Sequence, residues 1–278
     1  MFRNNRIADN RYNFDVWGKT PSDFVNDVDT SNTVDGRPVY YWIGRRDIAV
    51  PLNAGCVILV NCTNITAQNL NLKNNGQGIL LAYTTNSVII QNNMSNNYNG
   101  IYLSQSSNNS IVGNIVKSNR WAGVYLFEAS NDIIYHNNFI NNAQQVYDDS
   151  WYTPLVSAST NVWDDGYPSG GNYWSDYEER YPDAEEIDDS GIWDTPYVID
   201  EDNQDNYPLM ELWSPPPSIA GDLNNDGIVD ISDMATAGKA FGSYLGHPRW
   251  DSTADMNNDD VVNIFDLALI ARNFGKTA

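Results

Sequence analysis

Oxygen-bearing side chains recur at fixed places in two twelve-residue windows near the C-terminus. Each window has Asp or Asn at its first, third, fifth, ninth and twelfth places. Ca2+ takes six or seven oxygen ligands, which a loop of this length supplies from side chains and from the backbone carbonyl of its seventh residue. The predicted ligands are Asp222, Asn224, Asp226, Ile228, Asp230 and Asp233 in the first window, and Asp255, Asn257, Asp259, Val261, Asn263 and Asp266 in the second.

The two windows form a tandem repeat. Each position of the second lies 33 residues after its counterpart, as Phe274 does after Phe241. Each window leads into an apolar segment, MATAGKAFG or LALIARNFG, whose final glycine is typical of a helix end. Gly227 occupies the sixth place of the first window, and Asp260, which also tolerates left-handed backbone, occupies that of the second. We therefore expect two calcium loops, the second looser than the first, each followed by a helix.

Residues 219–276 resemble a type I dockerin. Asp rather than Glu stands at the twelfth place and no helix is expected before the first loop, so an ordinary EF-hand pair does not fit. The resemblance implies calcium-dependent folding and docking onto a cohesin-like domain of another protein. A calcium-stabilised module without a docking role is the alternative. The resemblance places partner binding at the tenth and eleventh loop residues, Ile231, Ser232, Ile264 and Phe265.

Four rows of similar sequence fill residues 56–144. Their period is 22, 22 and then 23, with the extra residue at 120–122. A single row cannot bury its own apolar face, so the rows must stack as coils. The pattern predicts a mostly β fold, a right-handed parallel β-helix, with three apolar columns pointing inward. These columns are Val57, Ile79, Ile101 and Val124; Leu59, Leu81, Leu103 and Leu126; and Leu72, Met94, Val116 and Phe139.

Asparagine recurs in two further columns at the turns between the apolar runs. Asn tolerates the left-handed turn conformation and can hydrogen-bond its copy in the next coil. We therefore interpret these asparagines as structural rather than ligand-binding. The columns are Asn64, Asn86, Asn108 and Asn131, and Asn75, Asn97, Asn119 and Asn142.

Longer motifs accompany the repeat, including DVDTSNTVDGRPVYYW at 27–42, NNGQGILLAYTTNS at 74–87 and GGNYWSDY at 170–177. On these motifs, residues 1–213 resemble the NosD-type repeats of archaeal surface proteins, within the broader carbohydrate-binding and sugar-hydrolase β-helix superfamily. The resemblance implies an extracellular or cell-surface location. The segment FRNNRIADNRYN resembles the end of a coil, so we expect Met1 to begin inside a longer coil stack.

The composition divides the chain into four parts. Three consecutive prolines from 215 to 217 make a stiff segment that ends any preceding element. We expect β-helix repeats over 1–144, an aromatic and acidic cap over 145–213, a linker over 214–218 and the dockerin over 219–278.

Catalytic carboxylates are scarce in the four rows, where Glu128 and Asp132 are the only acids. Glycoside hydrolysis needs a carboxyl pair across one bond. The cap is richer, and a catalytic pair would combine Asp164 or Asp165 with Asp176. Its tryptophans either stack on sugar rings or cover the last coil, and covering a strand edge is the reading we favour.

A weaker version of the loop pattern lies within the cap. It has Ser at its fifth place instead of an acid, which makes a third calcium site tentative. The ligands of that site would be Glu186, Asp188, Ser190, Ile192 and Asp194. Four N-x-S/T triplets are candidate glycosylation sites, at Asn61, Asn64, Asn93 and Asn108.

Charge and ligand chemistry exclude several functions. A net charge of −21 and a pI near 4.1 disfavour nucleic-acid partners, and no apolar run approaches the length of a membrane span. Copper prefers clustered His, Cys or Met, whereas His136 and His247 are isolated in the sequence. We therefore expect no copper site.

The sequence favours a non-catalytic extracellular β-helix anchored to a partner through a calcium-dependent dockerin. Two alternatives remain open. The first is a carbohydrate-active enzyme, either a polysaccharide lyase or a glycoside hydrolase, or a polysaccharide-binding protein of a dockerin-assembled complex. The second is a structural subunit that binds another copy of itself head to tail, because a β-helix has open ends.

Overall fold

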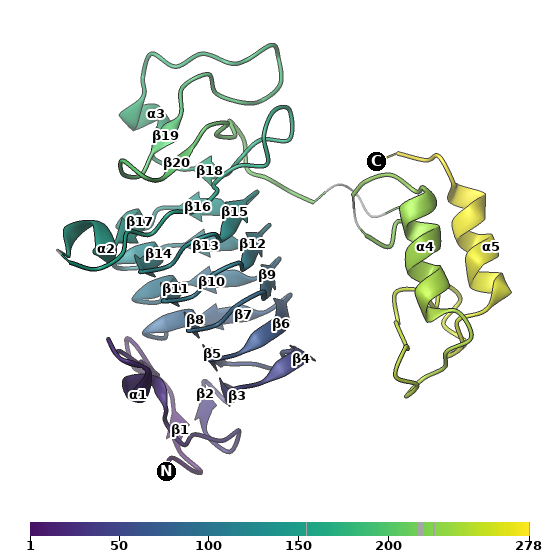
Figure 1. The fold of residues 1–278 in the computed structure, drawn as a ribbon, viewed down its shortest axis with the longest axis horizontal. Helices are drawn as coiled ribbons and strands as arrows, with labels where there is room; N and C mark the ends of the chain where they lie inside the picture. The colour runs from purple at the N-terminus through teal and green to yellow at the C-terminus, as the bar shows by residue number, and fades with distance from the viewer. Residues whose placement is uncertain (154, 216–218, 225, 278) are drawn as a thin grey trace. The chain divides into compact units, whose positions relative to one another are not determined.

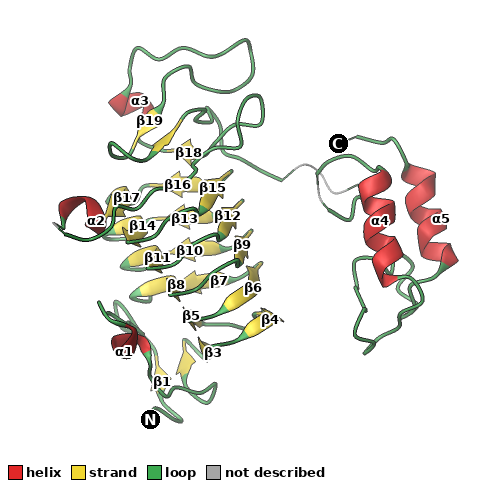
Figure 2. Cartoon of the chain, viewed as in Figure 1, coloured by secondary structure: helices red, strands yellow, loops and turns green. Residues whose placement is uncertain are grey.

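The computed structural model describes residues 1–153, 155–215, 219–224 and 226–277. The chain divides into two compact units, Met1–Trp213 and Ser214–Ala278. Residues 216–218 of the expected linker lie outside the described residues. Strands dominate the first unit and two helices the second, as Figure 2 shows.

The first unit is a parallel β-helix whose strands stack in three sheets (Figure 1). The sheet with the order β1-β2-β3-β5-β8-β11-β14-β17 consists of Arg6–Ile7, Thr33–Val34, Arg37–Ile43, Cys56–Val60, Gln77–Ala82, Asn99–Ser104, Ala122–Phe127 and Gln144–Asp148. The order β15-β12-β9-β6-β4 comprises Ile133–Tyr135, Ser110–Val112, Val88–Ile90, Thr63–Gln68 and Arg46–Ala49. The order β18-β16-β13-β10-β7 comprises Tyr173–Trp174, Asn138–Ile140, Ile115–Lys117, Asn93–Ser95 and Asn71–Lys73. Three short helices and a two-stranded sheet accompany them: α1 Pro21–Phe24, α2 Asp149–Tyr152, α3 Tyr177–Arg180, β19 Tyr197–Val198 and β20 Gln204–Asp205.

The predicted columns are confirmed by the strand register. Leu59 pairs with Leu81, Leu81 with Leu103, and Leu103 with Leu126, and all of these side chains are fully buried. The columns that begin at Val57 and Leu72 stack in the same way. The extra residue of the third row is also placed correctly, because the pairing offset rises from 22 to 23 between 119 and 122.

Asparagine is expected to adopt left-handed turns and to hydrogen-bond its copy in the next coil. Each of the two asparagine columns does one of these two things. Asn64, Asn86, Asn108 and Asn131 take the left-handed backbone, with φ between 53° and 62°. The other column forms a ladder that consists of Asn75, Asn97, Asn119 and Asn142. The backbone N–H of each asparagine donates to Oδ1 of the equivalent asparagine in the next coil, at 2.9–3.0 Å. Each coil is thereby tied to the next by amide side chains, all of them buried except that of Asn142.

Two further ladders were not predicted. One runs from Asn92 through Asn114, Asn137 and Asn172 to Asp205, with N–H to oxygen distances of 2.7–3.0 Å. The other runs from Ser87 through Asn109, Asp132 and Asn161 to Asn203, at 2.8–3.0 Å. Both ladders extend beyond residue 144, so the cap is built directly on the hydrogen bonding of the coils.

Aromatic side chains close the C-terminal end of the coil stack. Trp174 pairs with Phe139 in the register and stacks on it at 4.5 Å between ring centroids. Tyr197 stacks on Trp174 in turn at 4.1 Å, and Trp163 is fully buried. These rings extend the apolar column beyond the last coil.

The second unit consists of two helices and two loops related by the 33-residue repeat. Helices α4, Ile231–Ala240, and α5, Ile264–Asn273, each begin at the tenth loop residue. Val229 N–H donates to the carbonyl of Lys276 at 3.0 Å, and Val262 N–H donates to that of Ser243, the position equivalent to Lys276, at 2.9 Å. Each loop is therefore held by the chain that follows the other helix. Within the described part of the chain, no helix has the length and apolarity needed to cross a bilayer.

Candidate functional site

The two predicted calcium loops adopt the same internal hydrogen bonding. The Asp222 carboxylate accepts from the N–H groups of Asp226 and Gly227, at 3.2 and 2.9 Å. Their counterparts 33 residues later make the same bonds at 3.1 and 2.9 Å. The twelfth residue, Asp233 in the first loop, accepts from Leu223 N–H at 2.7 Å and closes the loop onto its helix.

The donor chemistry of the loops fits a hard cation. The first and twelfth residues, Asp222, Asp233, Asp255 and Asp266, are at most 8% exposed. No Lys or Arg stands between 222 and 233 or between 255 and 266. Oxygen donors without a balancing positive side chain suit Ca2+ rather than a soft metal.

The predicted carboxylate ligands of the loops are not gathered into one cluster of side chains. Over the described residues, no three His, Cys, Asp or Glu side chains come together as a metal-binding group. The loops combine carboxylates with amide and backbone oxygens and are closed by the hydrogen bonds given above. Their use as two calcium sites therefore stays a prediction.

The sixth loop position requires a left-handed backbone in both repeats. Gly227 has φ of 83° and Asp260 has φ of 64°. A side chain costs free energy in this region, although Asp tolerates it better than most residues.

Replacement of Asp260 by Gly is therefore expected to raise the free energy of unfolding of the second unit by about 0.5–1 kcal/mol. It should also tighten calcium binding at the second loop. Chemical denaturation and calcium titration of the full chain measure the two effects. Gly227→Asp is the matched control and should lower both the free energy of unfolding and the calcium affinity of the first loop. An increase of either quantity in that control would contradict the strain assigned to Asp260.

The predicted partner-binding residues lie in the first turns of α4 and α5. Ile231, Ile264 and Phe265 are 69%, 62% and 67% exposed, and Ser232 is exposed as well. The N-cap side chains Asp230 and Asn263 hold these turns by accepting from the backbone N–H two residues later, at 2.6 and 2.8 Å. The repeat thus presents two similar apolar faces on rigid helix starts.

The tentative third loop folds as a short hairpin. The backbones of Glu186 and Trp193 form an antiparallel β-bridge, and the carbonyl of Ile192 accepts from Ile187 N–H at 2.8 Å. Glu186 also accepts from Gly191 N–H at 2.7 Å. Asp188 and Ser190 lie within this turn, and Asp194 accepts from Glu185 N–H at 3.1 Å. A calcium ion at this hairpin stays a prediction.

Three of the candidate glycosylation sites lie at the surface. Asn61 and Asn108 are exposed residues between strands, and Asn64 is an exposed residue of β6 that donates to Asp47 at 2.7 Å. Asn93 is half-buried in β10, and its Oδ1 is buried. An attached glycan fits the first three positions better than Asn93.

Residues of the types that bind copper do not fit a copper centre. Cys56 and Cys62 are both buried, and burial raises the pKa of the Cys56 thiol to about 12, which opposes the thiolate form. His136 donates from Nε2 to the Ser169 carbonyl at 2.9 Å, and burial lowers its pKa. Met94 is part of the coil core, and His247 belongs to the other unit.

The suggested catalytic carboxylates have separate partners. Asp164 accepts from Asn206 N–H at 3.0 Å and Asp165 accepts from Ser169. Asp176 accepts from Gln145 Nε2 at 3.0 Å and lines a cavity that includes neither of the other two. That cavity also contains Asp148 and Asp200, which the sequence did not single out because 52 positions separate them.

A parallel β-helix followed by paired loop–helix repeats defines a modular protein with a repeat domain and an appended small domain. The family described as "Periplasmic copper-binding protein (NosD)" matches residues 1–179, and the chain belongs to this family. The description "Dockerin type I domain" matches residues 220–275. No curated protein matches the chain.

Proposed function

We propose that this protein is a non-catalytic, extracellular β-helix module that is anchored to a partner protein through its calcium-loaded dockerin. The observation that carries the proposal is the pair of exposed apolar helix starts, each held by a loop with the donor set of a calcium site. Rigid apolar groups suit an interface because little conformational freedom is lost on binding.

A cohesin-type domain is the partner that the dockerin implies, and another copy of the chain is the alternative. The β-helix repeats, the cap and the dockerin act in this proposal as display module, end cover and anchor. Two loops bind calcium in the second unit, and the hairpin at 186–194 is a tentative third site. The protein acts at the cell surface, which the dockerin match favours, whereas the NosD match is described as periplasmic.

Charge placed on the docking faces is expected to abolish partner binding. Changing Ile264 and Phe265 to Asp should weaken binding at least ten-fold, or about 1.4 kcal/mol, because these exposed side chains then resist desolvation. Changing Ile231 and Ser232 to Asp as well should remove the second face and the remaining affinity. The measurement is a binding titration of the full chain with type I cohesin domains in the presence of calcium. A second titration measures binding of the chain to another copy of itself.

Calcium affinity and a matched surface variant serve as controls. Leu245 is 63% exposed in the same unit but lies outside both helix starts, so Leu245→Asp adds a charge without altering either face. That variant should bind the partner normally, and all variants should keep their calcium affinity. Undiminished binding by the four-residue variant would refute the proposed faces.

A further inference from the structure

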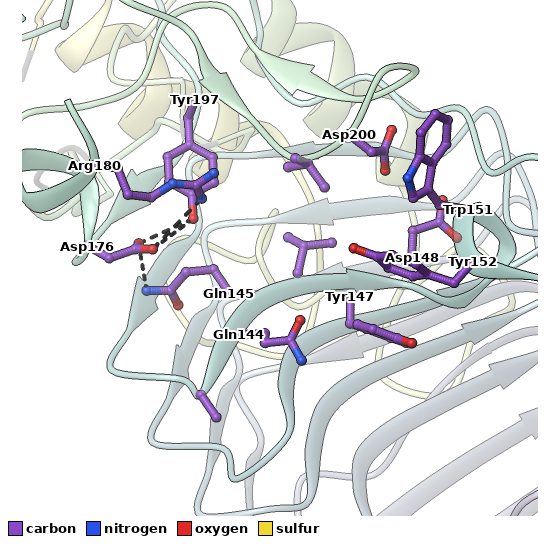
Figure 3. A pocket seen from close by; sticks show the side chains of 13 residues that line it. Gln144, Gln145, Tyr147, Asp148, Trp151, Tyr152, Asp176, Arg180, Tyr197 and Asp200 are labelled. Carbon is purple, nitrogen blue, oxygen red and sulfur yellow. Dashed lines mark hydrogen bonds and ion pairs between the residues drawn. The ribbon is translucent and has the colours of Figure 1, made fainter.

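A cavity of about 310 Å³ lies between β17 and α2 on one side and residues 176–200 of the cap on the other (Figure 3). Its walls combine four aromatic rings with three carboxylates. Asp148, Trp151 and Asp200 are seen at one end of the cavity, whereas Asp176, Arg180 and Tyr197 are at the other. Neither the calcium loops nor the docking faces belong to it, so any ligand here is independent of the proposed anchoring.

The single arginine of the cavity is already neutralised. Arg180 lies 4.2 Å above the centroid of Tyr197 and 3.9 Å from Asp176, and it donates to the carbonyl of Val198 at 2.9 Å. Asp176 also accepts from the hydroxyl of Tyr197 at 3.1 Å. Guanidinium and carboxylate thus balance each other at this end.

The carboxylates at the other end have no such balance. Among the residues that the structure describes, neither Asp148 nor Asp200 forms an ion pair. Asp148 is only 5% exposed, and its Oδ1 accepts from Ser150 N–H at 2.8 Å. Burial, with the nearby charge of Asp200, raises the pKa of Asp148. A positively charged ligand would relieve that repulsion.

Exposed aromatic rings accompany these acids. Trp151 is 41% exposed and Tyr152 is 67% exposed, although residues of this size usually pack inside. Tyr152 stacks on Tyr147 with 5.4 Å between ring centroids and 14° between ring planes. The faces of such rings attract cations as well as the apolar faces of sugars.

We propose that this cavity binds a ligand through a primary ammonium group, held between Asp148 and Asp200 against the rings of Trp151 and Tyr152. Asp200 accepts from Asn203 Nδ2 and Asp202 N–H, and Asp148 accepts from Ser150 and Ser159, but neither carboxylate has a cationic partner among the described residues. An ammonium can donate three hydrogen bonds to this pair, whereas an anionic sugar such as a uronate would be repelled. Either an amino sugar or a lysine side chain supplies this group.

Calorimetric titration of the full chain tests the inference with three probes: glucosamine, its uncharged analogue N-acetylglucosamine, and Nα-acetyl-lysine amide. We expect saturable binding of the two amines, weakened by added salt, and no saturable binding of the acetylated sugar. Tighter binding of glucosamine identifies an amino sugar as the source, and tighter binding of the lysine derivative identifies a peptide. Equal binding of glucosamine and N-acetylglucosamine, or absence of amine binding, overturns the inference.

Two variants locate the binding. Asp200→Asn should weaken amine binding about ten-fold because a charge-assisted hydrogen bond becomes a neutral one. Trp151→Ala alters an exposed side chain and should weaken amine binding with little effect on folding. Asp183→Asn removes the same charge from an exposed cap position outside the cavity and should change nothing. Amine binding that survives both cavity variants would place the ligand elsewhere and contradict the assignment.

Discussion

Chelation of calcium is expected to unfold residues 219–277 while the β-helix stays folded. The second unit has a small core, formed by residues such as Val229, Val262 and Ile270, and its two loops concentrate carboxylates without Lys or Arg. A ligand that binds only the folded state at 100 times its Kd adds about 2.7 kcal/mol, so two sites add roughly 5 kcal/mol. That contribution is comparable to the whole stability of a small domain.

Hydrogen–deuterium exchange of the full chain, read by peptide, measures this effect unit by unit. With EDTA, protection should be lost in α4 and α5 and retained in the coils around Leu81 and Leu103. EDTA saturated with calcium should change nothing. A variant with Asp222 and Asp255 changed to Ala should exchange rapidly in calcium as well. Protection of the helices that survives EDTA would show that the loops do not depend on the ion.

Rising pH is expected to destabilise the β-helix between about pH 4 and pH 7. Burial raises the pKa of Asp132 and of Asp205 to about 7, against about 4 in the unfolded chain. Between these values the folded state holds protons that the unfolded state has lost, so its free energy of unfolding falls as pH rises. The loss is complete above the folded-state pKa and amounts to roughly 2–4 kcal/mol for each carboxyl.

The ladder offers a matched test of the Asp132 contribution. Asp132 occupies a rung where Asn109 precedes it and Asn161 follows it, and its Oδ2 is buried without a partner among the described residues. Asp132→Asn should therefore stabilise the β-helix at pH 8, by on the order of 2–4 kcal/mol, and alter it little at pH 4. Denaturant unfolding in excess calcium, followed by the β-sheet circular dichroism band, gives both values.

The reciprocal change serves as the control. Asn109→Asp, one rung earlier, should destabilise at pH 8 more than at pH 4, because it buries a second ionisable carboxyl beside Asp132. Equal stability of Asp132→Asn and the unmodified chain at pH 8 would mean that Asp132 is ionised at no cost.

The coil register could be predicted because apolar side chains carry it. Leu59, Leu81, Leu103 and Leu126 recur at spacings of 22, 22 and 23, and two further apolar columns repeat with the same spacings. The ladder from Asn92 to Asp205 lacks such a signal. Asparagine is too common in the rows to mark a single column, and its rungs beyond Asn137 are separated by 35 and 33 residues instead of 22.

The calcium loops and the cavity also differ in how well the sequence predicts them. Loop residues such as Asp222 and Asp233 lie within one short window, so their spacing alone predicts shared chemistry. The cavity brings Asp148 and Asp200 together through the path of the cap, which sequence spacing does not encode. Asp176 drew attention as an acid in an aromatic segment, but its partners Gln145 and Tyr197 depend on tertiary packing.

The amide ladders also make the coil a unit of evolution. Because neighbouring coils place their rungs at equivalent positions, removal or duplication of a whole row, such as residues 77–98, would join matching positions and keep the amides of the Asn75 ladder opposite a backbone N–H. Removal of part of a row would shift the rungs and leave buried amides unpaired, which is costly. We therefore expect this β-helix to tolerate the gain or loss of a whole coil better than the gain or loss of part of one.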